Sequence, residues 1–159
     1  MQEYKEKLLA EAAKLHQKYE LSKTVGPDWF EPGMMEYLDK YEGIYDEENS
    51  ILTLRFDSRG TRYDGRTEEI ESLCTGDVVQ IRRDAENAFN PNNFVILSTK
   101  GKDIGNVPAE LCNAIAPIYD RGGLEFISAC ASFVEPLSKR SRYAKQAVLF
   151  VELRIKLYC

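Results

Sequence analysis

Alternating hydrophobic and polar residues predict that strands dominate the chain beyond residue 50. In segment 51–57 (ILTLRFD) apolar and polar residues alternate, and segment 147–157 (AVLFVELRIKL) repeats that pattern over a longer stretch. A period of two is typical of a strand with one buried face. Further strands are predicted at 78–82 (VVQIR), 93–99 (NFVILST), a short segment around Ile104, and 124–134 (LEFISACASFV). The last of these has no polar face, so we expect it at the centre of a sheet.

Apolar residues spaced three to four apart predict helices in two other regions. Stripes in 2–21 and 34–41 predict two helices near the N-terminus, separated by the Gly- and Pro-bearing segment 24–33. Another helix is predicted to begin at Pro108, because the fixed φ of proline suits a first helical turn. Pro117 lies inside that stretch and predicts a bend or an early end.

The order of these elements indicates the fold class. The acidic segment 45–49 (YDEEN) is predicted to be an exposed connector, which divides the chain into a helical extension (1–48) and a β domain (49–159). Strands with one inserted helix favour a mainly β (α+β) fold over a doubly wound sheet. We expect a small OB-like, partly closed β-barrel of about six strands, preceded by the N-terminal helical segment.

The composition is that of an ordinary folded chain, but its charge is unevenly distributed. Of 159 residues 43% are hydrophobic, and no apolar run approaches the roughly 18 residues that a membrane span needs. The N-terminus lacks a signal-peptide pattern, so we expect a cytoplasmic protein with no membrane partner. The net charge is −5, to which residues 1–50 contribute −6 and the rest +1. A strongly basic nucleic-acid binder is therefore excluded, whereas a local basic surface is not.

Most catalytic and metal-binding arrangements lack the residues they need. The only histidine is His16, and no C-x-x-C pair occurs among the four cysteines, Cys74, Cys112, Cys130 and Cys159. We therefore expect no catalytic residues, no metal and no cofactor, and hence no enzyme. One alternative stays open, a magnesium-dependent nuclease whose metal is held by converging carboxylates. Its candidate ligands are Asp57, Asp64, Asp84 and Glu86.

Residues suited to binding nucleic acid are better represented. The segment RGTRYDGR places Tyr63 among Arg59, Arg62 and Arg66. Arginines bind phosphates, and an aromatic ring stacks a base of any identity. The cluster therefore indicates a surface for single-stranded nucleic acid. The alternative interpretation is that Tyr63 packs on the barrel while the arginines are solvated.

A longer motif resembles a known family. The stretch GDVVQIRRDAENAFNPNNFVILSTKGKDIGNVPAEL resembles the core signature of HIRAN domains, and the upstream GTRYDG resembles their G-x-R-Y-Y segment. The matching positions are Gly76, Val79, Ile81, Arg83, Asp84, Asn87, Phe89, Asn93, Val95, Gly101, Ile104, Gly105, Pro108 and Leu111. The resemblance covers roughly residues 51–157. It implies a barrel related to the OB-fold that binds DNA and catalyses no reaction.

The resemblance also implies roles for individual residues. HIRAN domains of fork-remodelling enzymes grip the 3′ end of single-stranded DNA, which implies a context of DNA repair or processing. By position, Tyr63 would stack the terminal base and Arg62 would hold a phosphate. Asp64 stands where the family has a second tyrosine, Asn90 where an aspartate receives the 3′-hydroxyl, and Asn106 where DNA-binding members have a histidine. The predicted nucleic-acid-binding residues are Arg59, Arg62, Tyr63, Asp64, Arg83, Asn90 and Asn106.

On the same resemblance, the segment between Arg83 and Asn93 is the loop that faces the ligand groove. Its roughly eleven residues exceed the two to five of a hairpin turn. We expect Asn87 and Asn93 to tie this loop to its own backbone, as asparagine does in turns. We expect Phe89 to anchor the loop in the barrel.

A different class of function stays open beside DNA binding. The acidic first third of the chain carries Leu, Met and Tyr stripes. Through residues 1–48 the protein would then dock a protein partner or self-associate, as a module that has lost DNA binding.

Overall fold

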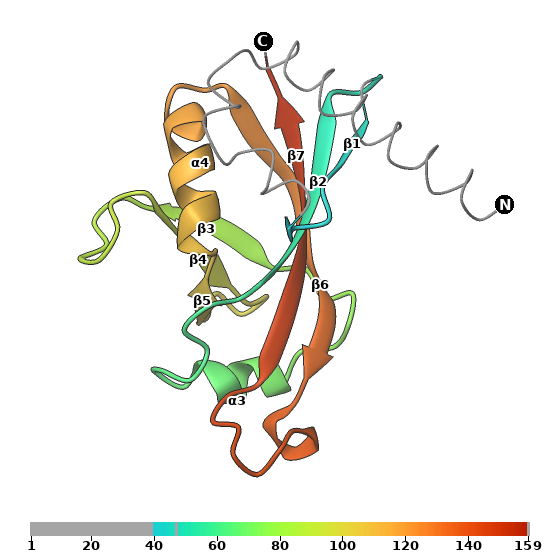
Figure 1. Cartoon of the computed structure of the whole chain (residues 1–159), viewed down its shortest axis with the longest axis vertical. Coiled ribbons are helices and arrows are strands. Elements are labelled where there is room, and N and C mark those ends of the chain that lie inside the picture. The colour runs from blue at the N-terminus through green and yellow to red at the C-terminus, as the bar shows by residue number, and fades with distance from the viewer. Residues whose placement is uncertain (1–39, 47, 159) are drawn as a thin grey trace, which may run out of the picture.

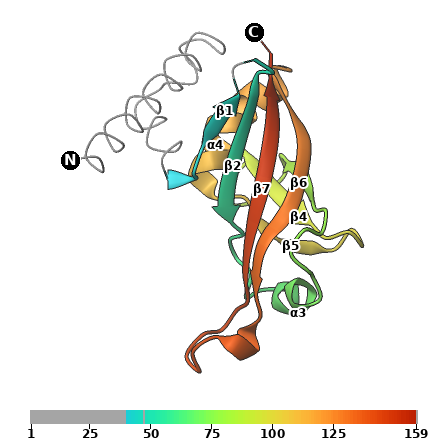
Figure 2. The same ribbon diagram turned by 90° about the vertical axis from the view of Figure 1, so that its right-hand side faces the viewer.

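Two antiparallel sheets form the described part of the chain, residues 40–46 and 48–158 of a computed structural model (Figure 1). The larger sheet has the order β1-β2-β7-β6, made of β1 (Ile44–Asp46), β2 (Ile51–Asp57), β7 (Val148–Leu157) and β6 (Leu124–Glu135). The smaller sheet consists of β3 (Gln80–Asp84), β4 (Asn93–Leu97) and β5 (Asp103–Asn106). The four strands of the larger sheet are seen side by side in Figure 2. The fold is therefore mainly β, as predicted.

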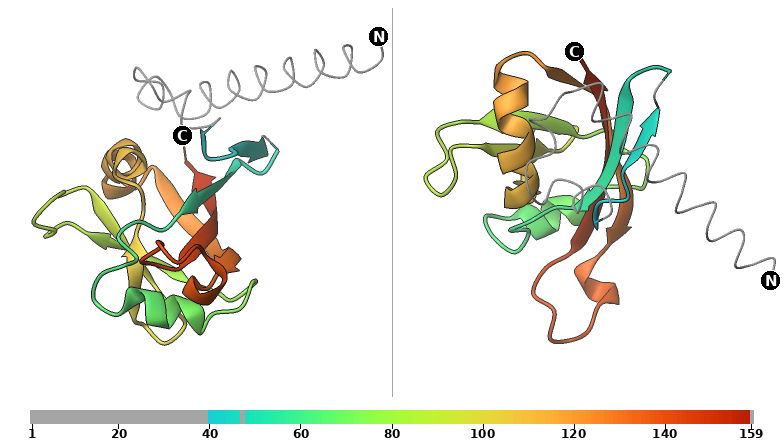
Figure 3. Two further views of the ribbon diagram at one scale, coloured as in Figure 1. Left: turned by 60° about the horizontal axis from the view of Figure 1, so that its bottom comes forward. Right: turned by 45° about the horizontal axis from the view of Figure 1, so that its top comes forward.

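Short helices accompany the sheets. They are α3 (Arg66–Glu71), α4 (Ala109–Asp120) and a 3-10 helix, η2 (Leu137–Lys139). Helix α4 and the smaller sheet lie on the same face of the larger sheet (Figure 3). The Tyr119 ring of α4 lies 5.3 Å from that of Phe94 in β4 and 5.2 Å from that of Phe126 in β6, between ring centroids. This aromatic cluster joins the helix to both sheets.

Strand β7 holds the larger sheet together because it pairs along both of its edges. Leu153, for example, lies opposite Leu54 of β2 and Ala129 of β6. Its inward residues have no exposed surface; they are Leu149, Val151, Leu153 and Ile155. The alternating pattern of 147–157 predicted this strand correctly, because one face of β7 is completely buried.

In the described chain the two sheets meet at two isolated bridges rather than through continuous strands. Beyond β2, Arg59 N donates to Asn106 O at 2.9 Å, and Asn106 N donates to Arg59 O at 3.0 Å. Before β3, Val79 N donates to Ala129 O of β6 at 3.0 Å. Because these contacts are isolated bridges, the described strands form two antiparallel sheets, and no closed barrel is shown. The predicted OB-like barrel is corrected to this arrangement.

Three local predictions are wrong, for reasons visible in the pairing. Segment 45–49 is not an exposed connector throughout, because β1 pairs with β2 and buries Tyr45. Strand β6 lies at the edge of the larger sheet rather than at its centre, and Val79 occupies part of its outer edge. Of the two outcomes predicted for Pro117, a bend or an early end, the early end is wrong, because helix α4 continues to Asp120 with the proline on its exposed side.

The residues before β1 enter the core at Tyr41. Its side chain is buried, and its hydroxyl donates to the carboxylate of Glu110 in α4, which Lys40 also contacts. Burial first, and then the bond to Glu110, raises the pKa of the Tyr41 phenol well above its ordinary value. The N-terminal part of the described chain is thereby fastened to α4.

Much of the predicted N-terminal extension falls outside the described residues. Helix 2–21 lies outside them entirely, as does helix 34–41 except for Lys40 and Tyr41. Both helices and the division at residue 49 therefore stay predictions. Among the described residues, no helix has the length and apolarity to cross a membrane.

The close approach of β5 to residues 58–59 predicts a large penalty for a side chain at Gly105. A Cβ there would lie 1.9 Å from Ser58 Oγ and 2.9 Å from the carbonyl oxygen of Arg59. Gly105→Ala should therefore lower the free energy of unfolding by about 3 kcal/mol, through overpacking and a positive φ.

Gly101→Ala is the matched control, since Gly101 also has a positive φ (79°) but faces open space. Gly101→Ala should lower the free energy of unfolding by only about 1 kcal/mol. Urea denaturation of the two variants measures the difference, and equal losses would show that the close approach does not constrain β5.

Candidate nucleic-acid interface

The turn 60–66, which follows β2, carries Tyr63 at the surface. Its bend requires left-handed backbone at Asp64 (φ 54°) and Gly65 (φ 75°). Arg66 closes the turn, because its Nη1 donates to the Gly60 carbonyl at 3.0 Å and its Nη2 to the carboxylate of Asp103 in β5 at 2.9 Å. Tyr63 is therefore carried on a turn that is fastened to the smaller sheet.

Arg62 and Tyr63 form one exposed unit. The guanidinium carbon of Arg62 lies 4.7 Å from the centroid of the Tyr63 ring, and the guanidinium also donates to the Tyr63 hydroxyl. Tyr63 is 51% exposed, so about half of its side chain is accessible to a ligand. A half-exposed ring with a cation over one face has an arrangement suited to stacking on a base.

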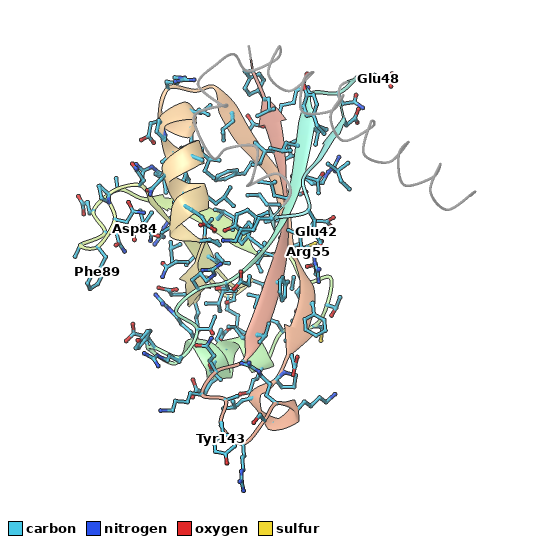
Figure 4. All side chains as sticks on the ribbon, in the orientation of Figure 1. Glu42, Glu48, Arg55, Asp84, Phe89 and Tyr143 are labelled. Atoms are coloured by element: carbon cyan, nitrogen blue, oxygen red, sulfur yellow. The ribbon has the colours of Figure 1, made fainter. Side chains whose placement is uncertain are left out.

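The loop between β3 and β4 is shaped by asparagine side chains. Asn87 Oδ1 accepts the backbone N–H groups of Phe89 and Asn90, each at 3.0 Å, and Asn90 Oδ1 accepts that of Asn92 at 3.0 Å. The prediction that Asn87 ties the loop to its own backbone is thereby confirmed. Phe89 is 99% exposed, so the prediction that it anchors the loop is wrong. The turn around Asn87 directs Phe89 outward from the body of the protein (Figure 4).

The side chain of Asn93 bonds to other side chains rather than to the loop backbone. Its Nδ2 donates to Asp84 Oδ2 and to Asn106 Oδ1, both at 3.1 Å. Asp84 Oδ2 also accepts a bond from Asn87 Nδ2 at 3.1 Å. This network joins the base of the loop to β5 and fixes Asn106 beside it, which corrects the role expected for Asn93.

A pocket of about 470 Å³ lies between the turn 60–66 and the loop 85–92. Its lining residues are Gly60, Tyr63, Asp64, Arg66, Asn87, Phe89 and Asn106. Three of the predicted site residues are thus brought together: Tyr63, Asp64 and Asn106. Their common pocket follows from the pairing of Arg59 with Asn106, which sets the turn against β5.

Four lining residues were absent from the predicted set: Gly60, Arg66, Asn87 and Phe89. The sequence placed Arg66 in the basic cluster, while Asn87 was expected to tie the loop to its own backbone and Phe89 to anchor the loop in the barrel. The one signal for Phe89 is a large aromatic residue in a polar, asparagine-rich segment outside any strand pattern. That signal indicates an exposed ring only once the turn around Asn87 is known.

The remaining predicted residues do not line the pocket. Asn90 Nδ2 donates to Asn113 Oδ1 of α4 at 3.1 Å. Arg59 Nε pairs with the carboxylate of Asp57 at 2.9 Å. Arg62 contributes through its contact with the Tyr63 ring.

Arg83 holds the loop to α4. Its Nε and Nη2 donate to the two carboxylate oxygens of Asp120, each at 3.0 Å. Its Nη1 donates to the carbonyl oxygens of Pro91 and Asn93 at 2.8 and 3.1 Å. These bonds hold the pKa of the Asp120 carboxyl below its ordinary value and raise the pKa of the Arg83 guanidinium. Arg83 is therefore engaged in positioning the loop.

The acids considered as magnesium ligands do not converge. Within residues 40–46 and 48–158, no three His, Cys, Asp or Glu side chains form a group that fits a metal ion. Asp57 pairs with Arg59, and Asp84 accepts bonds from asparagine amides. The carboxylates are therefore used individually, in ion pairs and in the loop network.

A larger hollow of about 710 Å³ lies between β3 and β6 and has a different character. Its lining consists of residues 78–81, Tyr119 and residues 124–129. Glu125 is the one charged side chain in this lining, so the hollow presents no cation to a phosphate. The smaller pocket, with Arg66 in its wall, suits a nucleic acid better.

Comparison with known families identifies the relationship. A family model described as the HIRAN domain matches residues 51–152, more than half of the chain. The chain belongs to the HIRAN domain family. The resemblance read from the motifs at 76–111 is thereby confirmed. No curated protein matches this HIRAN chain.

Several solved structures are similar to this HIRAN chain. A crystal structure of a protein from Lactobacillus plantarum has a TM-score of 0.51 and 15% identity, covering 65% of this chain and 95% of that chain. The crystal structure of the HIRAN domain of human HLTF has a TM-score of 0.47 and 21% identity, covering 65% and 76%. An NMR structure of the HLTF HIRAN domain in its DNA-bound conformation has a TM-score of 0.45 and 19% identity, covering 66% and 75%.

The Arg83–Asp120 pair predicts an acid-sensitive attachment of the loop. Because the pKa of Asp120 is lowered in the folded state, the pair stabilises the fold above the ordinary aspartate pKa of about 3.9 and this stabilisation is lost as the pH falls through the lowered value. Arg83→Gln should raise the pKa of Asp120 toward that ordinary value.

An NMR titration of side-chain carboxyl carbons measures this shift. Arg82→Gln is the matched control, because Arg82 is the exposed neighbour. If the pKa of Asp120 stays low in Arg83→Gln, the pairing with Arg83 is not what lowers it.

Proposed function

We propose that this HIRAN protein is a non-catalytic module that binds the end of a single DNA strand in the pocket bordered by Tyr63 and Phe89. The observation that carries the proposal is this pair of rings, 51% and 99% exposed, on the lining of one pocket. Exposed rings beside cations are typical of surfaces that stack bases. The family includes a HIRAN domain, that of human HLTF, described in a DNA-bound conformation.

The two rings come from different segments, which suits them to hold one base. Tyr63 is fixed by the turn 60–66, and Phe89 lies on the loop that Asn87 shapes. Each aromatic contact with a base contributes about 1–3 kcal/mol to single-strand binding. Arg62, above the Tyr63 ring, supplies a cation for the adjoining phosphate.

The carboxylate that meets the strand end is that of Asp64. It lines the pocket, whereas Asn90 does not, and the Asn90 amide is bonded to Asn113. A carboxylate accepts a strong hydrogen bond from a hydroxyl and repels a phosphate. We infer that Asp64 selects a strand that ends in a 3′-hydroxyl, as befits a module of DNA repair or processing.

Removing either ring should weaken DNA binding without unfolding the protein, since both are exposed. Tyr63→Ala and Phe89→Ala should each lower the affinity for a short single strand by about 5- to 100-fold, the loss expected for one stacked base. Fluorescence anisotropy at low salt measures this affinity. Tyr158→Ala is the control, because Tyr158 is 47% exposed at the C-terminal end of β7. Single-strand binding that neither variant weakens would place the site elsewhere.

Selectivity for the strand end tests Asp64 separately. The unmodified protein should prefer a 3′-hydroxyl oligonucleotide to its 3′-phosphate counterpart by about tenfold, equivalent to about 1.4 kcal/mol of repulsion and lost hydrogen bonding. Asp64→Asn should remove most of that preference by gaining affinity for the phosphate. Competition titrations give the ratio, and an identical preference in both proteins would exclude Asp64 from this role.

A further inference from the structure

The connection between β6 and β7 carries a concentrated positive charge. Segment 138–145 (SKRSRYAK) contains four basic residues and no acidic one. Lys139, Arg140, Arg142 and Lys145 form no ion pair with any other described residue. Tyr143 lies at the far end of this connection, pointing away from the protein (Figure 4). Unpaired cations around an exposed ring form a surface that attracts a polyanion.

Arg142 and Tyr143 repeat the geometry of Arg62 and Tyr63. The guanidinium carbon of Arg142 lies 4.9 Å from the Tyr143 ring centroid, against 4.7 Å in the first pair. Arg142 Nη2 donates to the Tyr143 hydroxyl at 2.7 Å. Tyr143 is 75% exposed, so its ring contributes little to the core. The protein therefore presents the same arginine–tyrosine unit twice.

The connection ends beside the turn that carries the first unit. Thr61 Oγ1 donates to the Ala147 carbonyl at 3.1 Å, and Ala147 N donates to Thr67 Oγ1 at 3.2 Å. Thr61 and Thr67 flank the turn 60–66. Tyr143 precedes Ala147 by four residues, a span of at most about 14 Å for an extended chain. Both units thus lie within reach of a single bound strand.

We propose that segment 138–145 is a second contact for the same single DNA strand, a few nucleotides away from the end held in the pocket. The proposal rests on the proposed function of that pocket. Tyr143 stacks an internal base, and Arg142, Lys139 and Lys145 bind the phosphates beside it. Single-strand sites on related small folds cover about 4–16 nucleotides, so the pocket alone accounts for only part of such a site.

The test compares two single strands with the same 3′ end, one of about 4 and one of about 12 nucleotides. For the longer strand, Tyr143→Leu should lower the affinity about fivefold or more, whereas Tyr143→Phe should keep it. For the shorter strand, both variants should bind like the unmodified protein. Arg142→Gln should also reduce the slope of log affinity against log salt by about 0.7 for the longer strand.

Arg154→Gln is the matched control for charge, because Arg154 is exposed on β7 near Asp46, at the other end of the larger sheet. It should leave the salt slope unchanged. If the longer strand binds Tyr143→Leu and the unmodified protein equally, the second contact is refuted while the pocket stands. If the unmodified protein binds neither strand, the proposed function and this inference both fail.

Discussion

The backbone pairing between Arg59 and Asn106 is the contact on which the candidate site depends. It is an isolated bridge between the two sheets, and it forms because β5 approaches residues 58–59 so closely that position 105 has no room for a side chain. The same pairing sets the turn 60–66 beside β5, where Arg66 reaches Asp103. Without this bridge, Tyr63 would have no fixed position relative to the loop that carries Phe89.

Hydrogen bonds between amide and carboxylate side chains then connect this bridge to the loop. Asn106 is bonded to Asn93, Asn93 to Asp84, and Asp84 to Asn87. Asn87 shapes the turn that exposes Phe89. Each of these bonds is modest alone, but in a connected set of partly buried amides the bonds reinforce one another. The two rings of the proposed site are therefore held by one continuous network of backbone and amide bonds.

The sequence predicted those features in which a single pattern dominates. Strands 51–57 and 147–157 alternate strictly because one face of each is buried, and the HIRAN motif at 76–111 identified the family. The edge position of β6 was missed, since an apolar run does not distinguish a central strand from an edge strand whose outer side is partly paired. Tertiary pairing of this kind leaves no local signal.

The candidate site could be predicted only in part, again because tertiary contacts leave no local sequence pattern. Tyr63, Asp64 and Asn106 line the pocket that their motifs suggested, whereas Arg83 binds Asp120 and Asn90 binds Asn113. Phe89 was expected to anchor the loop in the barrel, whereas it is exposed. Its exposure depends on the hydrogen bonds of Asn87, which a linear pattern does not contain.

We propose that a DNA strand end enters the pocket between Tyr63 and Phe89. The most direct test of this proposal is an NMR titration of the isotope-labelled protein with a short 3′-hydroxyl single strand. If the strand end enters this pocket, the largest shifts should fall on the backbone amides of residues 60–66, 87–90 and Asn106. Shifts concentrated instead in the hollow between β3 and β6, at residues 78–81 and 124–129, would contradict it.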